Sequence, residues 1–513
     1  MSKKKIKKIF SYVIINTIMS IQNMMKQTHD SDFSGKVPTC LKMGSGRRDK
    51  AVPSKRSLQK FAAENQSDFS ESNNIIRFNI NSGALLDLPQ ATFSFDLTNT
   101  TGASNTLKLD GSCASIIDTF RVYSQDGTEL ERIQEYALID SVLGQYDGDI
   151  DEDSLLCGAP ARKSDFPAFA SVNSGVTASP ATVNTKDHGL QIVSTMSSGT
   201  SILAVSSRGG VGYDQLQSDS LDNNVTKHYE MPFRASGWFN PSMNKLLPPN
   251  CSFVVELQLN TAVKAFLRTG SDAPAYKVNN TYLNIPAVTI NDPVCIQHLQ
   301  DKMAMGIQWS GYTYSHHVNT TSGPSADTIQ INARAFDLNA LVSIFRNQAN
   351  ISVADKMAIS KRSIQGISQY QYTLGSTQMP AQPCKIVIPG TVETIAGDQV
   401  LTAGTSSNVS QCFSELRRVL HHVKRVGGAV NVSAENFAQS EINQGTGLLS
   451  VDVAAYNDES VMSGLDTKST SMPVSLEINK STVLTGDTLQ CDTFALCGVI
   501  YSRMPDGRLS SSY

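Results

Sequence analysis

Charge, closely spaced cysteines and long apolar runs are all scarce in this 513-residue sequence. Charged residues make up only 17% of the chain, below the roughly 25% that is usual for soluble domains. The nine cysteines are scattered, and no two of them form a Cys-x-x-Cys pair. This spacing indicates neither a zinc knuckle nor a dense disulfide framework. We therefore interpret the cysteines as buried free thiols of a reducing compartment.

Catalytic signatures are also missing, since the sequence has no GxSxG, HExxH or GxxxxGK[ST] motif. The adjacent histidine pairs at 316–317 and 421–422 have no third and fourth ligand in the sequence nearby, which argues against a metal site. The acidic loop 147–153 does not fit a calcium loop, because Glu152 and Gly158 stand where Gly and Glu are required. We predict no enzyme activity, no catalytic residue, no metal site and no cofactor. Whether loop 147–153 binds a divalent ion is left open.

The net charge of −3 is distributed unevenly along the chain. Residues 1–60 contain 14 Lys/Arg and three Asp/Glu, so the rest of the sequence is acidic. Clustered cations bind phosphate by releasing counterions, and they are also attracted to anionic lipid. We predict a basic arm that faces nucleic acid or a membrane. Its candidate contacts are Lys3, Lys4, Lys5, Lys7, Lys8, Arg47, Arg48, Lys50, Lys55 and Arg56.

The first 25 residues place five lysines before a short apolar stretch, residues 9–21. This stretch is interrupted by polar residues and is shorter than the roughly 20 apolar residues that span a bilayer. No cleavage site of the Ala-x-Ala kind follows it. Two interpretations stay open: an amphipathic helix on a membrane surface, or a disordered leader upstream of a true start at Met24, Met25 or Met43. Residues 27–70 are polar and aperiodic, so 1–70 is predicted to be a largely disordered arm and linker.

From about residue 74 the sequence is typical of β-strands. IIRFNI (75–80) and ATFSFDLTN (91–99) alternate apolar and polar residues, and ASIIDTFRVYS (114–124) ends near the Asp-Gly pair at 126–127. The spacing in ELERIQEYALIDSVL (129–143) predicts a short helix. A Ser/Gly/Val/Thr-rich segment, about 155–225, is too long for an ordinary connection and predicts an exposed insertion.

The second half of the chain repeats this plan. Strand-like segments recur at 328–345, 369–374, 448–456, 471–479 and 493–504, and 412–426 predicts a helix. That helix has a basic face, which is interpreted either as a charged outer face or as a contact for nucleic acid or lipid. We expect an all-β fold of two tandem jelly-roll β-sandwiches, with short helices in the connections and long loops. The predicted domains are 71–291 and 307–513, joined by a linking helix at 292–306.

Two Asp-Gly turns, at 126–127 and 506–507, are expected to close equivalent edges of the two sandwiches, because Asp-Gly favours tight hairpins. With both halves in view, residues 70–513 resemble the double jelly-roll major capsid proteins of the adenovirus, polinton-like virus and virophage lineage. The segments that carry the resemblance are TFRVYSQDGTELERIQEYALIDSVL, WFNPSMNKLLPPNCSFVVELQLN, YKVNNTYLNIPAVTIND, VMSGLDTKSTSMPVSLEIN and TFALCGVIYSRMPDGRLSSSY. These are family-like patterns without fixed residues, so no single functional residue is carried over.

The resemblance implies a homotrimer with a pseudo-hexameric outline that tiles an icosahedral shell. It implies as partners the chain itself, neighbouring capsomers, minor capsid or penton proteins, and viral DNA or an internal membrane through the arm. The expected location is the virion, with assembly inside the host cell, in the nucleus or the cytoplasm. Two other classes stay open from the residues alone: a β-sandwich spike or carbohydrate-binding module, and a β-sandwich glycosidase, which would need two suitably spaced carboxylates.

Overall fold

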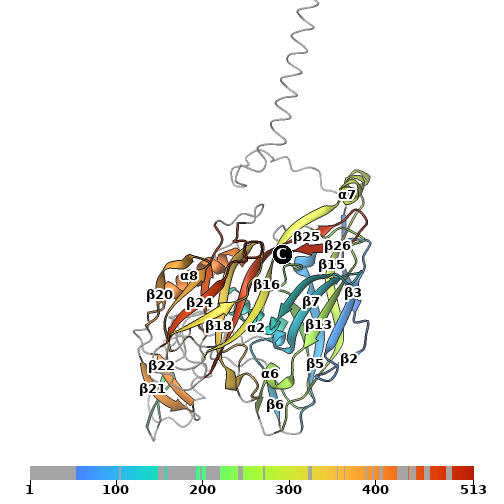
Figure 1. The fold of residues 1–513 in the computed structure, drawn as a ribbon. Coiled ribbons are helices and arrows are strands. Elements are labelled where there is room, and N and C mark those ends of the chain that lie inside the picture. Colours follow the sequence, from blue (N-terminus) through green and yellow to red (C-terminus); the bar gives the residue numbers. More distant parts are fainter. Residues whose placement is uncertain are drawn as a thin grey trace, which may run out of the picture. The chain divides into compact units, whose positions relative to one another are not determined.

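The computed structural model describes the following residues, to which every structural statement below refers: 54–102, 105–147, 156–158, 192–196, 199–203, 220–240, 246–269, 272–321, 326–354, 356, 358–362, 364, 366–387, 390–395, 398–403, 408–423, 437, 446–455, 463–480 and 488–513. Residues 54–513 belong to one compact unit, in which strands predominate (Figure 1). Most of the predicted arm, of the insertion 155–225 and of the acidic loop 147–153 lies outside the described residues.

The first jelly roll consists of two antiparallel sheets that enclose an apolar core. One sheet has the order β1-β15-β5-β12, formed by β1 (Ser54–Ala62), β15 (Tyr276–Ile290), β5 (Thr92–Asn99) and β12 (Thr226–Pro232). The facing sheet has the order β3-β13-β7-β8, formed by β3 (Ile75–Ile80), β13 (Phe253–Leu259), β7 (Ile117–Ser124) and β8 (Glu129–Gln134). Short strands complete the edges and ends: β2 (Asp68–Phe69), β4 (Leu85–Leu86), β6 (Thr106–Leu109), β11 (Ser220–Leu221) and β14 (Phe266–Thr269).

The second jelly roll is built in the same way. Its first sheet has the order β16-β25-β18-β23, formed by β16 (Ile307–Thr321), β25 (Leu489–Arg503), β18 (Leu338–Asn347) and β23 (Leu449–Asp452), with β26 (Leu509–Ser512) added to β25. Its second sheet has the order β17-β24-β19-β20, formed by β17 (Asp327–Ile331), β24 (Val474–Lys480), β19 (Ile367–Leu374) and β20 (Thr377–Lys385). Two further hairpins, β9–β10 (Ile192–Met196, Gly199–Leu203) and β21–β22 (Gly390–Ile395, Asp398–Ala403), extend from the loops.

The two jelly rolls have identical strand order. When the eight principal strands of each are counted along the chain, both show the order first–eighth–third–sixth in one sheet and second–seventh–fourth–fifth in the other. This arrangement is the jelly-roll topology. The all-β prediction of two tandem jelly rolls is therefore confirmed, and β1, β8 and β12 correspond to β16, β20 and β23.

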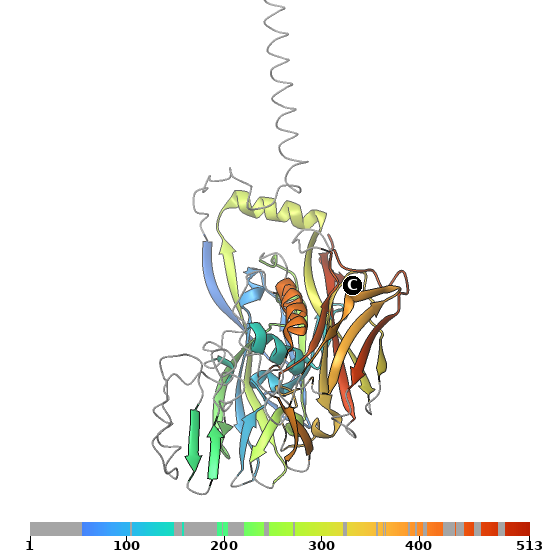
Figure 2. The same cartoon turned by 90° about the vertical axis from the view of Figure 1, so that its left-hand side faces the viewer.

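Helices occupy the connections. The main ones are α2 (Tyr136–Asp147), α7 (Pro293–Met305), which is the helix expected at 292–306, and α8 (Ser410–Val423); α6 (Ala262–Ala265) and the 3-10 turns η2 (Leu88–Gln90), η3 (Cys113–Ile116) and η4 (Gln348–Asn350) are short. Figure 2 shows α7 lying across one end of the two jelly rolls, with the hairpin β9–β10 toward the opposite end. None of the helices in the described ranges has the length and apolar character that a membrane crossing needs.

Burial explains why these segments are strands. In β3 the side chains of Ile76, Phe78 and Ile80 point into the core while their neighbours do not, as alternation predicts. In β18 every residue from Leu338 to Arg346 is buried, because both faces of this strand are covered. Near its end, Arg346 Nη2 lies 3.7 Å from Glu135 Oε2 of the first jelly roll.

Three sequence predictions need correction. Residues 129–134 are not helical: they form β8, which pairs with β7, and the helix begins only at Tyr136 after Glu135, whose φ is +51°. Pairing with β7 buries Leu130 and Ile133 as well as a helix would. The spacing of apolar residues therefore did not distinguish a strand from a helix here. The arm is shorter than 1–70, because β1 begins at Ser54 and pairs with β15 along its whole length.

The third correction concerns the Asp-Gly turns, which do not close equivalent edges. Gly127 (φ +88°) joins β7 to β8, the fourth and fifth strands of its jelly roll. Gly507 (φ +90°) instead joins the eighth strand, β25, to the additional strand β26. The true counterpart of the first turn lies between β19 and β20, at Gly375 (φ +62°).

Candidate functional site

The richest concentration of polar chemistry lies at the junction of the two jelly rolls. At its centre β8 faces β16. The buried carboxylate of Glu131 on β8 accepts hydrogen bonds from Ser236 Oγ (2.5 Å), Gly237 N (2.7 Å) and Trp238 N (3.2 Å). Burial raises the pKa of Glu131, and these donors oppose the shift. The carboxylate thus fixes the loop that follows β12 against the junction.

That loop approaches β16 so closely that only glycine fits. A Cβ atom added to Gly237 would lie 2.1 Å from the carbonyl oxygen of Tyr312. A Cβ atom added to Gly311 would lie 2.8 Å from the carbonyl oxygen of Gly237. The two jelly rolls are therefore in direct backbone contact.

A cluster of aromatic side chains from both jelly rolls packs at this contact. The ring of Trp238, from the first jelly roll, lies 5.6 Å from Trp309 and 5.1 Å from Tyr501, both from the second. It also packs edge-on against Phe253 at 5.2 Å. Aromatic pairs in such geometry stabilise beyond their buried area.

A chain of charged groups crosses the junction beside this cluster. The buried guanidinium of Arg346 donates from Nε (2.9 Å) and Nη2 (2.7 Å) to Asp492 Oδ2, and its Nη2 lies 3.7 Å from Glu135 Oε2. Lys264 links Glu135 (2.5 Å) to Asp118 (3.1 Å). Arg346 and Asp492 belong to the second jelly roll and the other three to the first, so the network ties the two together.

The other oxygen of Asp492 is also engaged. His316 Nε2 lies 3.0 Å from Asp492 Oδ1, and Gln490 donates to the same oxygen at 2.9 Å. Burial would raise the pKa of Asp492, but Arg346 and His316 outweigh it and lower the pKa to about 2. The carboxylate is therefore charged at any physiological pH.

A second group of polar contacts between the two jelly rolls involves Asp110 and α2. Asp110 accepts backbone hydrogen bonds from Ala358 (2.9 Å), Ile359 (2.7 Å) and Ser360 (3.0 Å) of the second jelly roll. From α2, Gln145 donates to the carbonyl of Ser360 (2.8 Å), and the hydroxyl of Tyr146 donates to the carbonyl of Thr446 (2.7 Å). As a result α2 is buried along residues 136–146.

The buried carboxyl group of Asp140, also on α2, is expected to make the stability of the fold depend on pH. Burial raises its pKa to about 6 from 3.8, although Arg234 lies 3.8 Å away and opposes the shift. Because the folded pKa is the higher one, the folded state binds this proton more tightly. The contribution of Asp140 to the free energy of unfolding is then greatest below pH 3.8 and falls by about 3 kcal/mol as the pH rises through 6. Urea unfolding at pH 4 and pH 7 measures this loss, and Asp140→Asn should abolish this part of it. A difference that persists unchanged in that variant would contradict the assignment.

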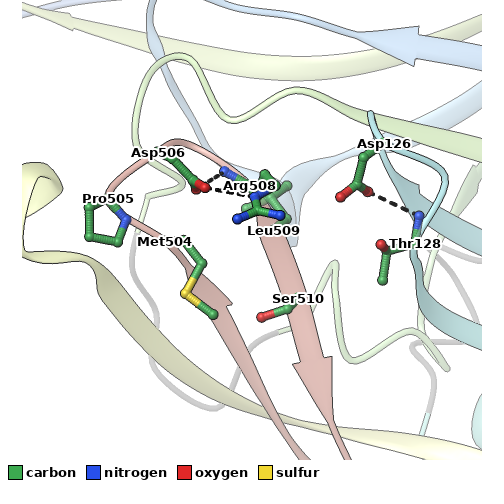
Figure 3. A pocket seen from close by; sticks show the side chains of 8 residues that line it. All are labelled: Asp126, Thr128, Met504, Pro505, Asp506, Arg508, Leu509 and Ser510. Atoms are coloured by element: carbon green, nitrogen blue, oxygen red, sulfur yellow. Dashed lines mark hydrogen bonds and ion pairs between the residues drawn. The ribbon is translucent and has the colours of Figure 1, made fainter.

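The two Asp-Gly turns, though not equivalent, lie side by side (Figure 3). They line a pocket of about 500 Å³ with Met504, Leu509 and neighbouring residues. Asp126 accepts from Thr128 N at 3.0 Å, and Asp506 pairs with Arg508 Nε at 2.7 Å. Each carboxylate is thus used within its own turn.

Among the predicted contact residues, the structure describes Lys55 and Arg56, and the other eight lie outside the described residues. Both are exposed on β1, and Arg56 forms an ion pair with Asp87 at 3.1 Å. The predicted basic helix is α8, on which Arg417 and Arg418 are exposed. Arg418 pairs with Glu415 on the same helix.

The remaining candidates are structural. The side chain of His316 is 4% exposed and packs against Phe494, with ring centroids 4.8 Å apart. Burial and the neighbouring His316 lower the pKa of His317 to about 4. No group of three His, Cys, Asp or Glu side chains in the described ranges is arranged to hold a metal ion. The eight described cysteines are free thiols and seven are buried.

None of the charged residues at the junction was predicted from the sequence to have a function. Asp110, Arg346 and Asp492 stand inside apolar segments, and a charge in such a segment is the one available signal, because a buried charge requires a partner. The sequence does not show which residue pairs with each of these charges. In the structure Arg346 and Asp492 are 146 positions apart and Asp110 and Ile359 are 249 positions apart.

Comparison with known proteins gives a clear result for the fold. No protein-family model and no curated protein matches the sequence. Among solved structures, the faustovirus major capsid protein is similar over 96% of this chain and 98% of its own, with a TM-score of 0.51 and 10% identity. The fold is a double jelly roll.

Two further solved structures are similar at lower scores. VP54 of PBCV-1, fitted into a reconstruction of the virophage Sputnik, covers 91% of this double jelly-roll chain (98% of its own) with a TM-score of 0.49 and 8% identity. The mavirus major capsid protein covers 93% (95% of its own) with a TM-score of 0.45 and 11% identity.

Proposed function

We propose that this chain is a viral major capsid protein that trimerises into pseudo-hexameric capsomers, which tile an icosahedral shell. The observation that carries the proposal is the presence of two jelly rolls of identical strand order in one chain, fused through a buried junction. Three copies would bring six similar barrels into one ring, and homo-oligomers of this kind close by cyclic symmetry. The likeness to the faustovirus major capsid protein over nearly the whole chain supports the same role.

In this proposal the protein acts by assembly and not by catalysis, and its place is the virion. The carboxylates of Asp110, Glu131 and Asp492 are each engaged by protein donors, which suits a structural junction. The partners are other copies of the chain, neighbouring capsomers, and minor capsid or penton proteins. Residues 155–225 would form an exposed tower.

The native mass of the full chain in solution tests the proposal directly. Light scattering after size exclusion should give three times the chain mass of 55.5 kDa, and such material should form shells or rings visible by electron microscopy. A monomer at micromolar concentration would remove the main support for a capsomer. A spike or carbohydrate-binding module would then be favoured, and glycan binding would be the next measurement.

The basic arm is proposed to contact the genome or an internal membrane. Replacing Lys3, Lys4, Lys5, Lys7 and Lys8 with Gln should weaken binding to a DNA duplex and lower the slope of log affinity against log salt by about 4. Fluorescence anisotropy between 50 and 200 mM salt provides the measurement, with vesicles of anionic lipid as a parallel probe. Affinity for both probes that neither depends on salt nor changes in the variant would contradict a role for the arm.

A further inference from the structure

The junction within one chain shows how two of these barrels pack. The fifth strand of the first jelly roll, β8, lies against the first strand of the second, β16. The two strands share no hydrogen-bonded ladder, so the contact is side-by-side packing. Three of the six residues of β8 are buried, and the helix that follows it, α2, is buried from residue 136 to residue 146.

The equivalent strands at the outer ends of the chain have no such cover. β20, the fifth strand of the second jelly roll, has only Cys384 buried. β1, the first strand of the first jelly roll, has no buried residue, and the side chain of Leu58 is 56% exposed. In Figure 1, β20 and α8 lie on the side of the second jelly roll that faces away from β15, the strand with which β1 pairs.

The helix after β20 differs from α2 in the same way. α8 buries Cys412, Leu416 and Val419 against its own barrel. Its opposite face, which includes Arg417, is exposed, whereas α2 is covered on all sides. The second jelly roll therefore carries an uncovered copy of the surface that the first uses at the junction.

We propose that β20 and the outer face of α8 pack against β1 of a second copy of this chain, repeating the contact of β8 and α2 with β16. The inference rests on the proposed trimer and identifies its contact surfaces. Because β1 and β20 are different surfaces, the contact is head-to-tail. It closes into a ring of three copies only if each copy is related to the next by a rotation of one third of a full turn.

The chemistry of the two strands suits packing without a shared ladder. β20 contains Pro380 and Pro383, which lack an N–H group, so this strand is protected from β-augmentation. Leu58 on β1 and Ala381 on β20 are exposed and apolar or small, and they offer surface that association would remove from water.

Two arginine variants of the full chain test the proposal. Leu58→Arg should place a cation in the contact from the β1 side, and Ala381→Arg should do so from the β20 side. Each variant is expected to elute at the mass of one chain where the wild type elutes at three. Val294→Arg is the matched control, because Val294 is 76% exposed on α7 and lies outside the proposed contact; it should stay trimeric.

Mixing the two variants separates a head-to-tail contact from all others. The Leu58→Arg chain retains an intact β20 surface, and the Ala381→Arg chain retains an intact β1 surface. One intact contact can then form, so the mixture should contain a species of twice the chain mass, while neither variant forms it alone. Both variants should show the wild-type fluorescence of the junction tryptophans, which verifies that they are folded.

The outcomes distinguish this inference from the proposed function. If the wild type is a monomer, the capsomer proposal fails and the contact fails with it. If the wild type is a trimer and either variant remains a trimer, the capsomer stands and the contact surfaces are wrong. A mixture of two monomeric variants that stays monomeric also overturns the pairing of β1 with β20.

Discussion

Replacing Arg346 with methionine is expected to lower the free energy of unfolding by about 3–5 kcal/mol, because it leaves the buried charge of Asp492 without its guanidinium partner. Arg346 is fully buried and gives two hydrogen bonds to one oxygen of Asp492. Methionine fills much of the space, so the loss reports on the charge more than on a cavity. The two tryptophans of the chain, Trp238 and Trp309, both lie at the junction, so their fluorescence in a urea titration measures this region.

The matched control removes both charges. Arg346→Met combined with Asp492→Asn should recover most of the lost stability, since exchanging a whole buried ion pair for neutral groups is often close to neutral. Arg346→Lys should fall between the two, because an ammonium group cannot reproduce the two-pronged contact of guanidinium. A single Arg346→Met variant within 1 kcal/mol of wild type would show that the pair does not hold the junction.

The strands could be predicted from the sequence because their pattern is local. Alternation in IIRFNI and the buried phenylalanines of ATFSFDLTN depends only on which face of a sheet meets the core. The linking helix could be predicted equally well, because its N-cap is local: Asp292 accepts a hydrogen bond from Val294 N at the start of α7. The doubled plan of strands followed from these local features.

The errors arose where tertiary pairing decides the outcome. Residues 129–134 have helical spacing, but the turn at Gly127 folds them back onto β7 and makes them strand. The Asp-Gly turns looked equivalent because local hairpin chemistry is the same in both. Their positions in the strand order differ, and strand order depends on contacts between residues that are far apart in the sequence.

The junction fixes one arrangement of the two barrels within the chain. Polar contacts with fixed geometry, such as those of Asp110 and Glu131, specify one arrangement of the barrels in a way that apolar packing alone does not. A fixed angle between the barrels sets the positions of β1 and β20, the surfaces proposed to meet the next copies. An error at the junction should therefore also disturb the proposed trimer.

Gly237→Ala is the sharpest test of that dependence. Its Cβ would lie 2.1 Å from the carbonyl oxygen of Tyr312, an atom of the backbone, so β16 or the loop after β12 must move. Movement also separates Glu131 from the N–H groups of Gly237 and Trp238. We expect a stability loss of about 3 kcal/mol, at the upper end for overpacked sites, and a loss of the proposed trimer. Gly83→Ala is the matched control, because nothing lies within 4 Å of its added Cβ. Equal stability and equal mass of the two variants, by urea unfolding and light scattering, would show that the backbone contact does not fix the angle between the barrels. The charged network would then fix this angle.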